Sequence, residues 1–413
     1  MNTKMAAIEI VKTLNAAGYV AYFAGGWVRD LIMQHPSDDI DIATDASPEI
    51  ILTLFPHTVK IGLAFGVVLV IMHGHPFEVA SFRKDVQYED GRRPTQIELS
   101  SAQEDALRRD FTINGLFYDP IKEEIYDYVN GISDIQKGII RTIGDPHERF
   151  TEDRLRMIRA IRFASRFSFS IEQETQQAIK THAPALFPSV AMERVWQEFH
   201  KMAKFPLFAQ AVLKMHHLEL LSVIFPALQS IQTPDLEKRV DAFHHFPKNT
   251  PPILYLMELF PNMPLEELLE LCEYFRTSAH EGRIVEYAFK GRALLEQEQG
   301  VEDLEWVYFY ANPFFQNCFE ALIARYAEEE KRCFTERHFK RRERLLPHIQ
   351  RVVERKPLVS AAILKEQGIL PGKLMGELLR EAERIAISQD LQEVGQVMKQ
   401  LRHSALWPKA DNR

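Results

Sequence analysis

Cysteine is scarce in this sequence: Cys272, Cys318 and Cys333 are the only three among 413 residues. Their number is odd and no two have C-x-x-C spacing, so we expect neither a disulfide framework nor a structural zinc site. We interpret them as reduced thiols of a cytoplasmic protein. No run of eighteen apolar residues occurs, which argues against a membrane-spanning helix, and the N-terminal stretch is amphipathic rather than a signal peptide.

An excess of positive charge is also missing, because 50 Lys and Arg residues stand against 58 Asp and Glu residues and leave a net charge of −8. This balance argues against a surface that coats nucleic acid indiscriminately, although a local basic stripe remains open. Internal repeats and low-complexity linkers are absent. A hydrophobic content of 46% over this length predicts two to four structural units with a substantial core.

The most informative stretch is residues 22–44, YFAGGWVRDLIMQHPSDDIDIAT. An apolar strand is predicted to end at a tight turn made by Gly25 and Gly26, where backbone N–H groups can approach a phosphate. Asp39 and Asp41 then alternate with isoleucines, which on a strand places both carboxylates on one face. Adjacent carboxylates repel each other unless a divalent cation lies between them, and Mg²⁺ with substrate phosphates is its usual identity.

GGWVRD followed by DID resembles the GGxVRD and DxD motifs of the class II tRNA nucleotidyltransferase and bacterial poly(A) polymerase family, within the polymerase-β-like superfamily. The resemblance implies an α+β N-terminal polymerase-β-like nucleotidyltransferase domain, a mixed sheet with helices, followed by all-α neck, body and tail domains. We expect a catalytic head over residues 1–140, a base-recognising neck over 141–203, and an RNA-binding body and tail over 204–413. Gly26 and Arg29 would cradle the triphosphate.

A third carboxylate commonly lies on a neighbouring strand in polymerase-β-like enzymes. Glu78, in PFEVASF, is our candidate metal ligand. The alternatives are an exposed strand residue or a residue that orients a ligand. His73 and His75 are better explained by a polar hairpin turn between strands than by a metal site.

Residues 83–105 are polar and lack periodicity, and DGRRP within them carries a turn signal. A solvated loop is one interpretation. The resemblance implies a flexible loop that assists the change from adding C to adding A. The next segment, LRRDFTINGLFY, resembles the family motif RRDFTINA, which implies that Arg109 binds phosphate or ribose through its planar fork. Gly115 replaces the usual Ala, a change that we expect to matter little.

A third block, EDRLRMIRAIRF, predicts a helix that begins at Thr151, with Asp153, Arg156, Arg159 and Arg162 three residues apart along one face. A solvated charge ladder would have the same spacing. EDRLR also matches the family motif EDxxR, which implies that Asp153 and Arg156 read the Watson–Crick edge of the incoming base. Arg159 and Arg162 would hold the base or its phosphates.

The basic stretch over residues 331–356 is either a solvated helix or a phosphate contact. Together with these patterns, the resemblance implies an enzyme that adds C, C and A to the 3′ end of tRNA without a template, using CTP, ATP and Mg²⁺, with no DNA or membrane partner. The alternatives are an A-adding enzyme, a poly(A) polymerase or, in another class, an inactive RNA-binding module. The intact Asp39 and Asp41 argue against the last of these.

Overall fold

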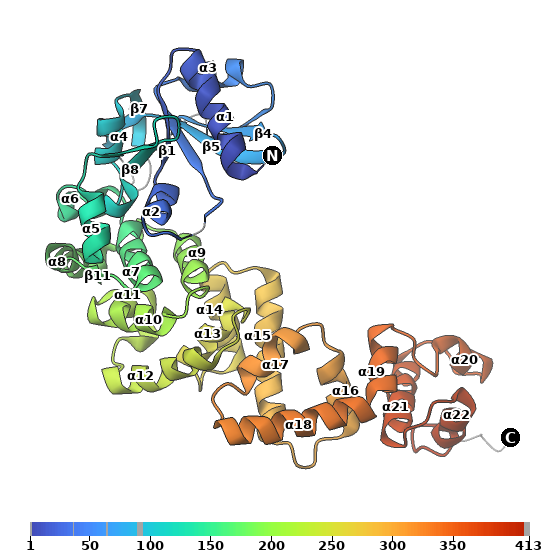
Figure 1. Ribbon diagram of the computed structural model, residues 1–413. Coiled ribbons are helices and arrows are strands. Elements are labelled where there is room, and N and C mark those ends of the chain that lie inside the picture. Colours follow the sequence, from blue (N-terminus) through green and yellow to red (C-terminus); the bar gives the residue numbers. More distant parts are fainter. Residues whose placement is uncertain (1, 36, 63–64, 89–93, 409–413) are drawn as a thin grey trace. The chain divides into compact units, whose positions relative to one another are not determined.

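The computed structural model describes residues 2–35, 37–62, 65–88 and 94–408. The chain divides into two compact units (Figure 1). The first comprises Met1–Asp241 and Tyr274–Arg276, and the second comprises Ala242–Glu273 and Thr277–Arg413. The predicted head and neck ranges both fall inside the first unit, so the three-domain division stays a prediction. No helix in the described ranges is long and apolar enough to cross a bilayer.

A mixed sheet forms the head of the first unit, as the sequence predicts. Among the described residues it has seven strands in the order β3-β4-β5-β2-β1-β8-β9. These strands are β1 (Ala21–Ala24), β2 (Asp41–Thr44), β3 (Thr58–Gly62), β4 (Val67–Met72), β5 (His75–Ser81), β8 (Leu116–Asp119) and β9 (Glu124–Asp127). Strand β1 pairs antiparallel with β2 and β8, whereas β2 pairs parallel with β5. The strand that begins at Asp41 and the strand of Glu78 are therefore neighbours.

Helices surround this sheet and continue into the neck. Ser47 caps α3, and Pro48 lies in its first turn. The first unit contains α1 (Thr3–Ala16), α2 (Gly26–Ile32), α3 (Pro48–Leu54), α4 (Ala102–Leu107), η2 (Thr112–Asn114), α5 (Gly131–Lys137), α6 (Pro146–Glu152), α7 (Leu155–Phe167), α8 (Gln173–His182), η3 (Ala183–Ala185), α9 (Met192–Met202), α10 (Phe208–His217), α11 (Leu220–Ile224), η4 (Pro226–Leu228) and α12 (Thr233–Asp241). Strands β10 (Ile139–Ile140) and β11 (Ser170–Ile171) form a short parallel pair beside α7.

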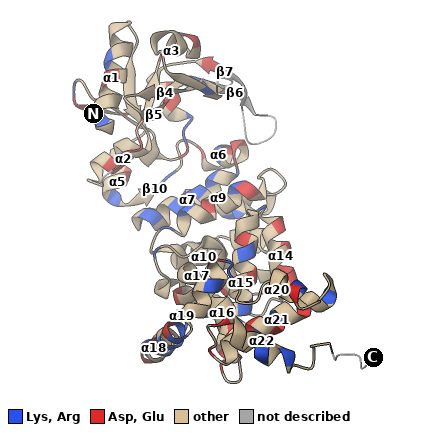
Figure 2. Cartoon of the chain, turned by 90° about the vertical axis from the view of Figure 1, so that its right-hand side faces the viewer, with Lys and Arg blue, Asp and Glu red and all other residues tan. Residues whose placement is uncertain are grey.

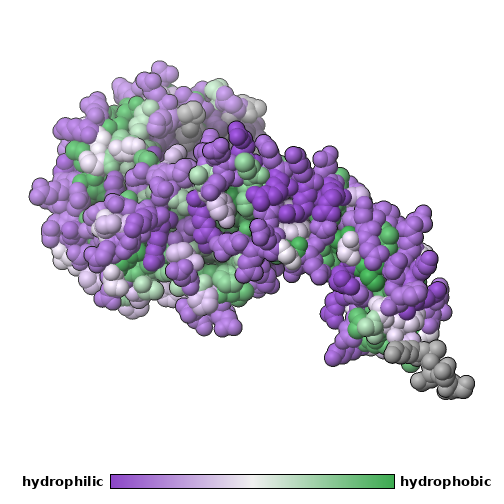
Figure 3. All heavy atoms as spheres, turned by 90° about the horizontal axis from the view of Figure 1, so that it is seen from below, coloured by the Kyte–Doolittle hydropathy of each residue, from purple (hydrophilic) through white to green (hydrophobic). Residues whose placement is uncertain are grey.

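The second unit is helical throughout its described residues. Its elements are η5 (Ala242–His245), α13 (Pro252–Leu259), α14 (Leu265–Tyr274, whose last residue groups with the first unit), α15 (Ala279–Glu296), α16 (Asp303–Ala311), α17 (Phe315–Leu322), α18 (Glu328–Arg344), α19 (Leu346–Val353), α20 (Ala361–Glu366), α21 (Lys373–Ser388) and α22 (Val394–Arg402). A core around Leu378, Ala386 and Leu401 packs α20, α21 and α22 together. On the face seen in Figure 3, hydrophobic residues lie in separate patches among hydrophilic ones.

The segment after β5 differs from the predicted loop. Strands β6 (Arg83–Tyr88) and β7 (Pro94–Leu99) pair antiparallel, and α4 follows directly. A two-stranded ladder is held by backbone hydrogen bonds, so it forms without the hydrophobic alternation by which strands are recognised in a sequence. Four residues of the DGRRP motif, Asp90 to Arg93, lie outside the described residues.

Gly115 occupies a crowded position, contrary to the expectation that Ala would fit there. A Cβ on Gly115 would lie 2.7 Å from Val129 Cγ2 and 3.0 Å from Ile143 Cδ1. Both neighbours belong to the buried core of the head, so they have little room to retreat. The tertiary environment, rather than the size of the residue alone, therefore decides the effect of this substitution.

We expect Gly115→Ala to destabilise the protein by about 1–3 kcal/mol through overpacking. Gly376→Ala is the control, because a Cβ on Gly376, within α21, would meet nothing within 4 Å. That variant should be neutral or stabilising, since Ala favours a helix. Urea unfolding of both variants measures the difference. Equal stability of Gly115→Ala and the parent would show that the core repacks around the added methyl group.

Candidate functional site

One cleft in the first unit collects the predicted site residues. Its volume is about 840 Å³, and it lies between the glycine turn, the carboxylate strand and the helices α7 and α9. In Figure 2, several ribbon segments of α7 and α9 have the colour of Lys and Arg. The cleft is lined by nine of the ten predicted residues, namely Gly26, Arg29, Asp39, Asp41, Arg109, Asp153, Arg156, Arg159 and Arg162. Glu78 is the one that does not line it.

The carboxylate pair stands at the start of β2. Asp41 is its first residue, and Asp39 precedes it rather than belonging to the strand as predicted. Burial first, and then the carboxylates of Asp39 and Glu78, raise the pKa of Asp41 to about 6, although the guanidinium of Arg109 lowers it. The Asp41 side chain nevertheless keeps contact with solvent. The pair is thus a concentration of negative charge that a bound cation would relieve.

Glu78 lies on the strand beside the carboxylate pair. Ile42 pairs with Val79 in the parallel ladder of β2 and β5, which brings Glu78 next to Asp41 on the adjacent strand. Its side chain is exposed. Within the described ranges, no group of three or more His, Cys, Asp or Glu side chains is placed to hold a metal ion. Asp39 and Asp41 with substrate oxygens match the way Mg²⁺ is usually bound, through one or two protein carboxylates and phosphates.

Arg109 faces the glycine turn. The φ of Gly25 is +65°, and a Cβ there would lie 3.0 Å from Arg109 Nη1, so only Gly lets the turn approach this guanidinium. The Arg109 Nε and Nη2 atoms donate to Asp105 Oδ2 at 3.1 and 3.0 Å, while Arg108 Nη2 donates to Asp105 Oδ1 at 2.6 Å. Asp105, only 1% exposed, therefore orients both arginines. Our sequence reasoning did not identify it, although it lies three and four residues ahead of them on α4.

Arg29 is held inside the protein, with 3% of its surface exposed. Its Nε and Nη2 atoms donate to Asp30 Oδ1 at 2.8 and 2.7 Å, and its Nη1 donates to Asn114 Oδ1 at 2.5 Å. The guanidinium also lies 4.5 Å from the ring centre of Phe167. Burial lowers its pKa, while Asp30 opposes that change. Each guanidinium nitrogen thus already has a protein acceptor, which favours a positioning role over direct contact with a triphosphate.

Asp153 and Arg156 lie where two helices meet, not in one continuous helix. The predicted start at Thr151 is wrong, because α6 runs through Thr151 to Glu152 and α7 begins at Leu155. Asp153 is extended between them, and its carboxylate accepts from Leu155 N at 3.1 Å and from Arg194 Nη2 at 3.0 Å. Asp145 instead caps α6. Because the helix is interrupted here, the Asp153 carboxylate turns into the cleft. In one continuous helix it would have lain in the same row of charges as Arg156 and Arg159.

Arg156 is anchored from both sides. Its Nη1 donates to Glu152 Oε2 at 2.7 Å and to the Arg149 carbonyl at 3.2 Å, and its Nη2 donates to the Arg108 carbonyl at 3.2 Å. Glu152 and Arg156 lie four residues apart, yet they belong to different helices. These contacts hold the guanidinium plane at the cleft, next to Asp153.

Arg159 and Arg162 both have acidic partners. Arg159 Nε donates to Asp110 Oδ2 at 2.8 Å, and Arg162 Nε lies 3.0 Å from Glu198 Oε2. Desolvation of the half-buried Asp110 would raise its pKa, yet its guanidinium and amide partners, Arg159 and Asn114, lower the pKa to about 2. Burial lowers the pKa of Arg162 to about 10, and Glu198 opposes that change. Asp110 thus joins α7 to the head, a connection that its position in the sequence does not reveal.

The cleft lining also includes residues that were not among the predicted site residues, and Arg166, Lys201, Lys204 and Phe205 are among them. A signal for Arg166 was present, because it continues the spacing of Arg159 and Arg162 along α7. Trp196 and Phe199 are buried. They fix α9, and through it Lys201, against the rest of the unit.

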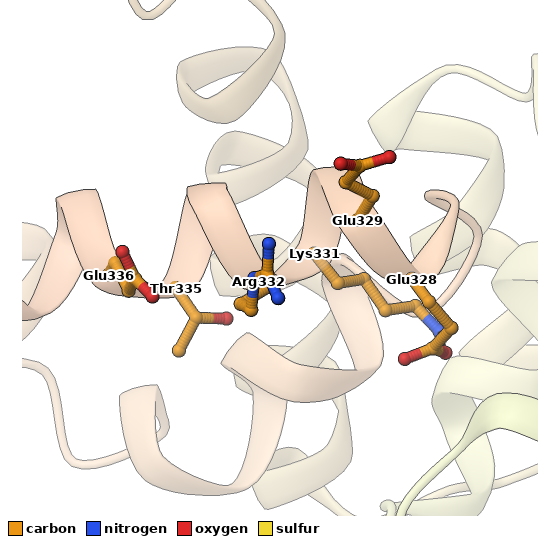
Figure 4. Close-up of a pocket in the computed structure, with 6 residues that line it drawn as sticks. All are labelled: Glu328, Glu329, Lys331, Arg332, Thr335 and Glu336. Carbon is orange, nitrogen blue, oxygen red and sulfur yellow. The ribbon is translucent and has the colours of Figure 1, made fainter.

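The basic stretch over residues 331–356 forms most of α18 and α19 in the second unit. Several of its arginines have acidic partners, since Arg337 and Arg341 pair with Glu298 and Arg344 pairs with Asp303. Figure 4 shows a hollow at the start of α18, lined by Glu328, Glu329, Lys331, Arg332, Thr335 and Glu336, where Lys331 reaches back to Glu328 at 2.9 Å. The hollow is lined by both acidic and basic side chains of one helix, which favours the solvated-helix interpretation of this stretch.

Comparison with sequence families gives two matches. Residues 21–141 match the family described as "Poly A polymerase head domain", and residues 168–232 match "Probable RNA and SrmB- binding site of polymerase A". The chain is 44% identical over 207 residues to the CCA-adding enzyme of Anoxybacillus flavithermus, covering 50% of this chain and 52% of that protein. It is 46% identical over 198 residues to that of Lactiplantibacillus plantarum, covering 48% of each. The matched region spans about half the length of these curated relatives.

Solved structures resemble the chain over nearly its whole length. The CCA-adding enzyme of Bacillus stearothermophilus in complex with CTP superposes with a TM-score of 0.82 at 25% identity and covers 98% of both chains. The Thermotoga maritima CCA-adding enzyme complexed with tRNA gives a TM-score of 0.65 at 20% identity and covers 96% of this chain and 94% of that one. The second likeness concerns the fold alone.

Proposed function

We propose that this chain belongs to the class II tRNA nucleotidyltransferase and poly(A) polymerase family. On that premise, it adds C, C and A to the 3′ end of tRNA. The nucleotides come from CTP and ATP, and no nucleic-acid template is needed. The observation that carries this proposal is the single cleft that unites the Asp39–Asp41 pair with Asp153 and Arg156. The residues proposed for catalysis and those proposed for base choice therefore line the same cleft in one unit.

The carboxylate pair is the proposed metal site, with Mg²⁺ as the cation. When bound, one Mg²⁺ ion would lower the pKa of the attacking 3′-hydroxyl, and a second would neutralise charge on the triphosphate and the leaving pyrophosphate. Asp39 and Asp41 contribute hard oxygen ligands, whose mutual repulsion fits a divalent ion. Glu78, on the adjacent strand, remains a candidate ligand. Arg109, held by Asp105 beside the glycine turn, and the turn residue Gly26 are the proposed phosphate contacts.

Base choice is assigned to Asp153 and Arg156. A carboxylate accepts a hydrogen bond from the exocyclic amine of C or A, and a guanidinium donates to a ring nitrogen or carbonyl. G and U present a carbonyl where C and A present the amine, so they leave the carboxylate unpaired. Arg194 holds Asp153 and Glu152 holds Arg156, which keeps both groups in place before a nucleotide arrives. Arg159 and Arg162 would flank the base or its phosphates.

The proposed partners are tRNA, CTP and ATP, and the helical second unit is the proposed location of further RNA contacts. Related enzymes have been solved with CTP, with ATP and with tRNA. The cysteines of the chain are free, and two of the three are buried. They fit a reducing compartment, so we propose the cytoplasm as its location.

The decisive experiment supplies tRNA lacking its three terminal nucleotides and each nucleotide, alone and combined, with Mg²⁺. CTP alone should extend the tRNA by two residues, and CTP with ATP by three. UTP and GTP should not be incorporated, and EDTA should stop the reaction. Long tails from ATP alone would identify a poly(A) polymerase. Addition only to tRNA already ending in CC would identify an A-adding enzyme, and no extension would favour an RNA-binding module.

A further inference from the structure

A continuous chain of hydrogen bonds runs along the wall of the cleft in the first unit, and all its members except Asp30 line the cleft. We name it the head–neck relay. It comprises, in order, Arg159, Asp110, Asn114, Arg29, Asp30 and Arg166. Arg159 donates to Asp110 at 2.8 Å, and Asp110 accepts from the Asn114 amide at 3.1 Å. At the other end, Arg166 Nη2 donates to Asp30 Oδ2 at 3.3 Å.

The relay begins and ends on the same helix. Arg159 and Arg166 are both on α7 and lie seven residues apart, which is about two helical turns. Of the middle members, Arg29 and Asp30 come from α2, Asn114 comes from η2, and Asp110 lies in the segment just before η2. The relay therefore grips α7 at two points and fixes both its rotation and its position along its axis. Asp153 and Arg156 lie at the N-terminal end of this helix.

Asn114 is the one uncharged member, and its chemistry is specific. Its Oδ1 accepts from Arg29, and its Nδ2 donates to Asp110. The reversed amide orientation would set donor against donor and acceptor against acceptor, so the network accepts a single arrangement. An aspartate at this position would still accept from Arg29 but would place a second carboxylate against Asp110. The side chain is 7% exposed, so water cannot readily replace a lost partner.

Asn114 also reaches the catalytic side of the cleft. Its backbone carbonyl accepts from Arg109 Nη1 at 3.3 Å. A Cβ on Gly25 would lie 3.7 Å from the same carbonyl oxygen. Asn114 thus contacts Arg109, beside the glycine turn, through its main chain. Its side chain contacts Asp110, which in turn accepts from Arg159 of the base-reading helix.

We propose that Asn114 is a specificity-determining positioning residue, which sets the base-reading end of α7 relative to the carboxylate pair through the relay. The inference rests on the proposed function and deepens it. A displacement of about 1 Å costs on the order of a hundredfold in rate when reacting groups must align. Breaking a hydrogen bond of the relay lets α7 shift. The rate of incorporation then falls more for the correct base than for an incorrect base, which never matched the site.

The test is Asn114→Asp, assayed for kcat/KM with CTP and with UTP on tRNA lacking its terminal three nucleotides. The ratio of the two values should fall at least tenfold. A lower fraction of active protein, or a lost contact to the ribose that all nucleotides share, would slow both equally and leave the ratio unchanged. Asn130→Asp is the control. It introduces the same charge at an exposed left-handed position outside the cleft, and its ratio should equal that of the parent.

Asp30→Asn is a second variant that disrupts the relay, and it adds no new buried charge. Asp30 does not line the cleft. It carries the test if Asn114→Asp does not fold, and its ratio should fall in the same direction. Hydrogen exchange in α7 should be faster in both variants. An unchanged CTP-to-UTP ratio in the folded variants overturns the assignment of Asn114. A parent protein that adds no nucleotide overturns the proposed function instead, so the two failures are distinct.

Discussion

Asp41→Asn is expected to lower nucleotide incorporation by about a thousandfold or more while the protein stays folded. The reason is electrostatic, because an amide cannot supply the negative charge that a divalent cation requires, and such a cation contributes several kcal/mol to the transition state. Incorporation of CTP into tRNA lacking its terminal three nucleotides, at saturating Mg²⁺, measures the loss. Asp38→Asn is the matched control, since Asp38 is exposed and does not line the cleft. That variant should work like the parent.

The stability of Asp41→Asn separates this explanation from a folding defect. The folded protein raises the pKa of Asp41 to about 6, above the value of an unfolded chain. The ionised carboxylate therefore costs folding free energy, with a penalty that grows from about pH 4 to pH 6 and is complete above that. The variant without metal at neutral pH should unfold at the same temperature as the parent or higher. A stable variant with near-normal turnover would remove Asp41 from the metal site.

Asp153→Ala is expected to lose base discrimination as well as rate. A site built to pair with a polar edge rejects a base that leaves its groups unpaired by roughly 10⁴-fold or more. Without the carboxylate, the exocyclic amine of C or A has no acceptor, and Arg194 loses its partner. The incorporation efficiencies of the amine-bearing bases, C and A, and of the carbonyl-bearing bases, G and U, then become more nearly equal. The measurement is kcat/KM for all four nucleotides in the variant and the parent.

Asp145→Ala provides the control for this prediction. Asp145 is also an aspartate at a helix end, since it caps α6, but it does not line the cleft. Its loss should cost about 0.5–2 kcal/mol of stability and leave the choice of base intact. If Asp153→Ala slows all nucleotides equally and still excludes UTP and GTP, the base is recognised elsewhere. Asp153 would then be a structural partner of Arg194.

The local elements of the site could be predicted from the sequence because each depends on neighbouring residues. A strand, a glycine turn and alternating Asp and Ile predict the place of Asp39 and Asp41, and nine of the ten predicted residues do line one cleft. The pattern was less reliable where an element ends. Spacing alone did not reveal that the helix breaks at Asp153, since charges three apart look the same on either side of a break.

Only the tertiary structure decided which charges meet. Asp110 and Arg159 are 49 residues apart, and Asp30 and Arg166 are 136 apart. No periodicity links residues so distant, because their contact depends on how the head and α7 dock. The sequence by itself determined which side chains the site contains. Docking determined that Arg29 is buried in a relay, since a buried charge persists only where packing supplies its partner.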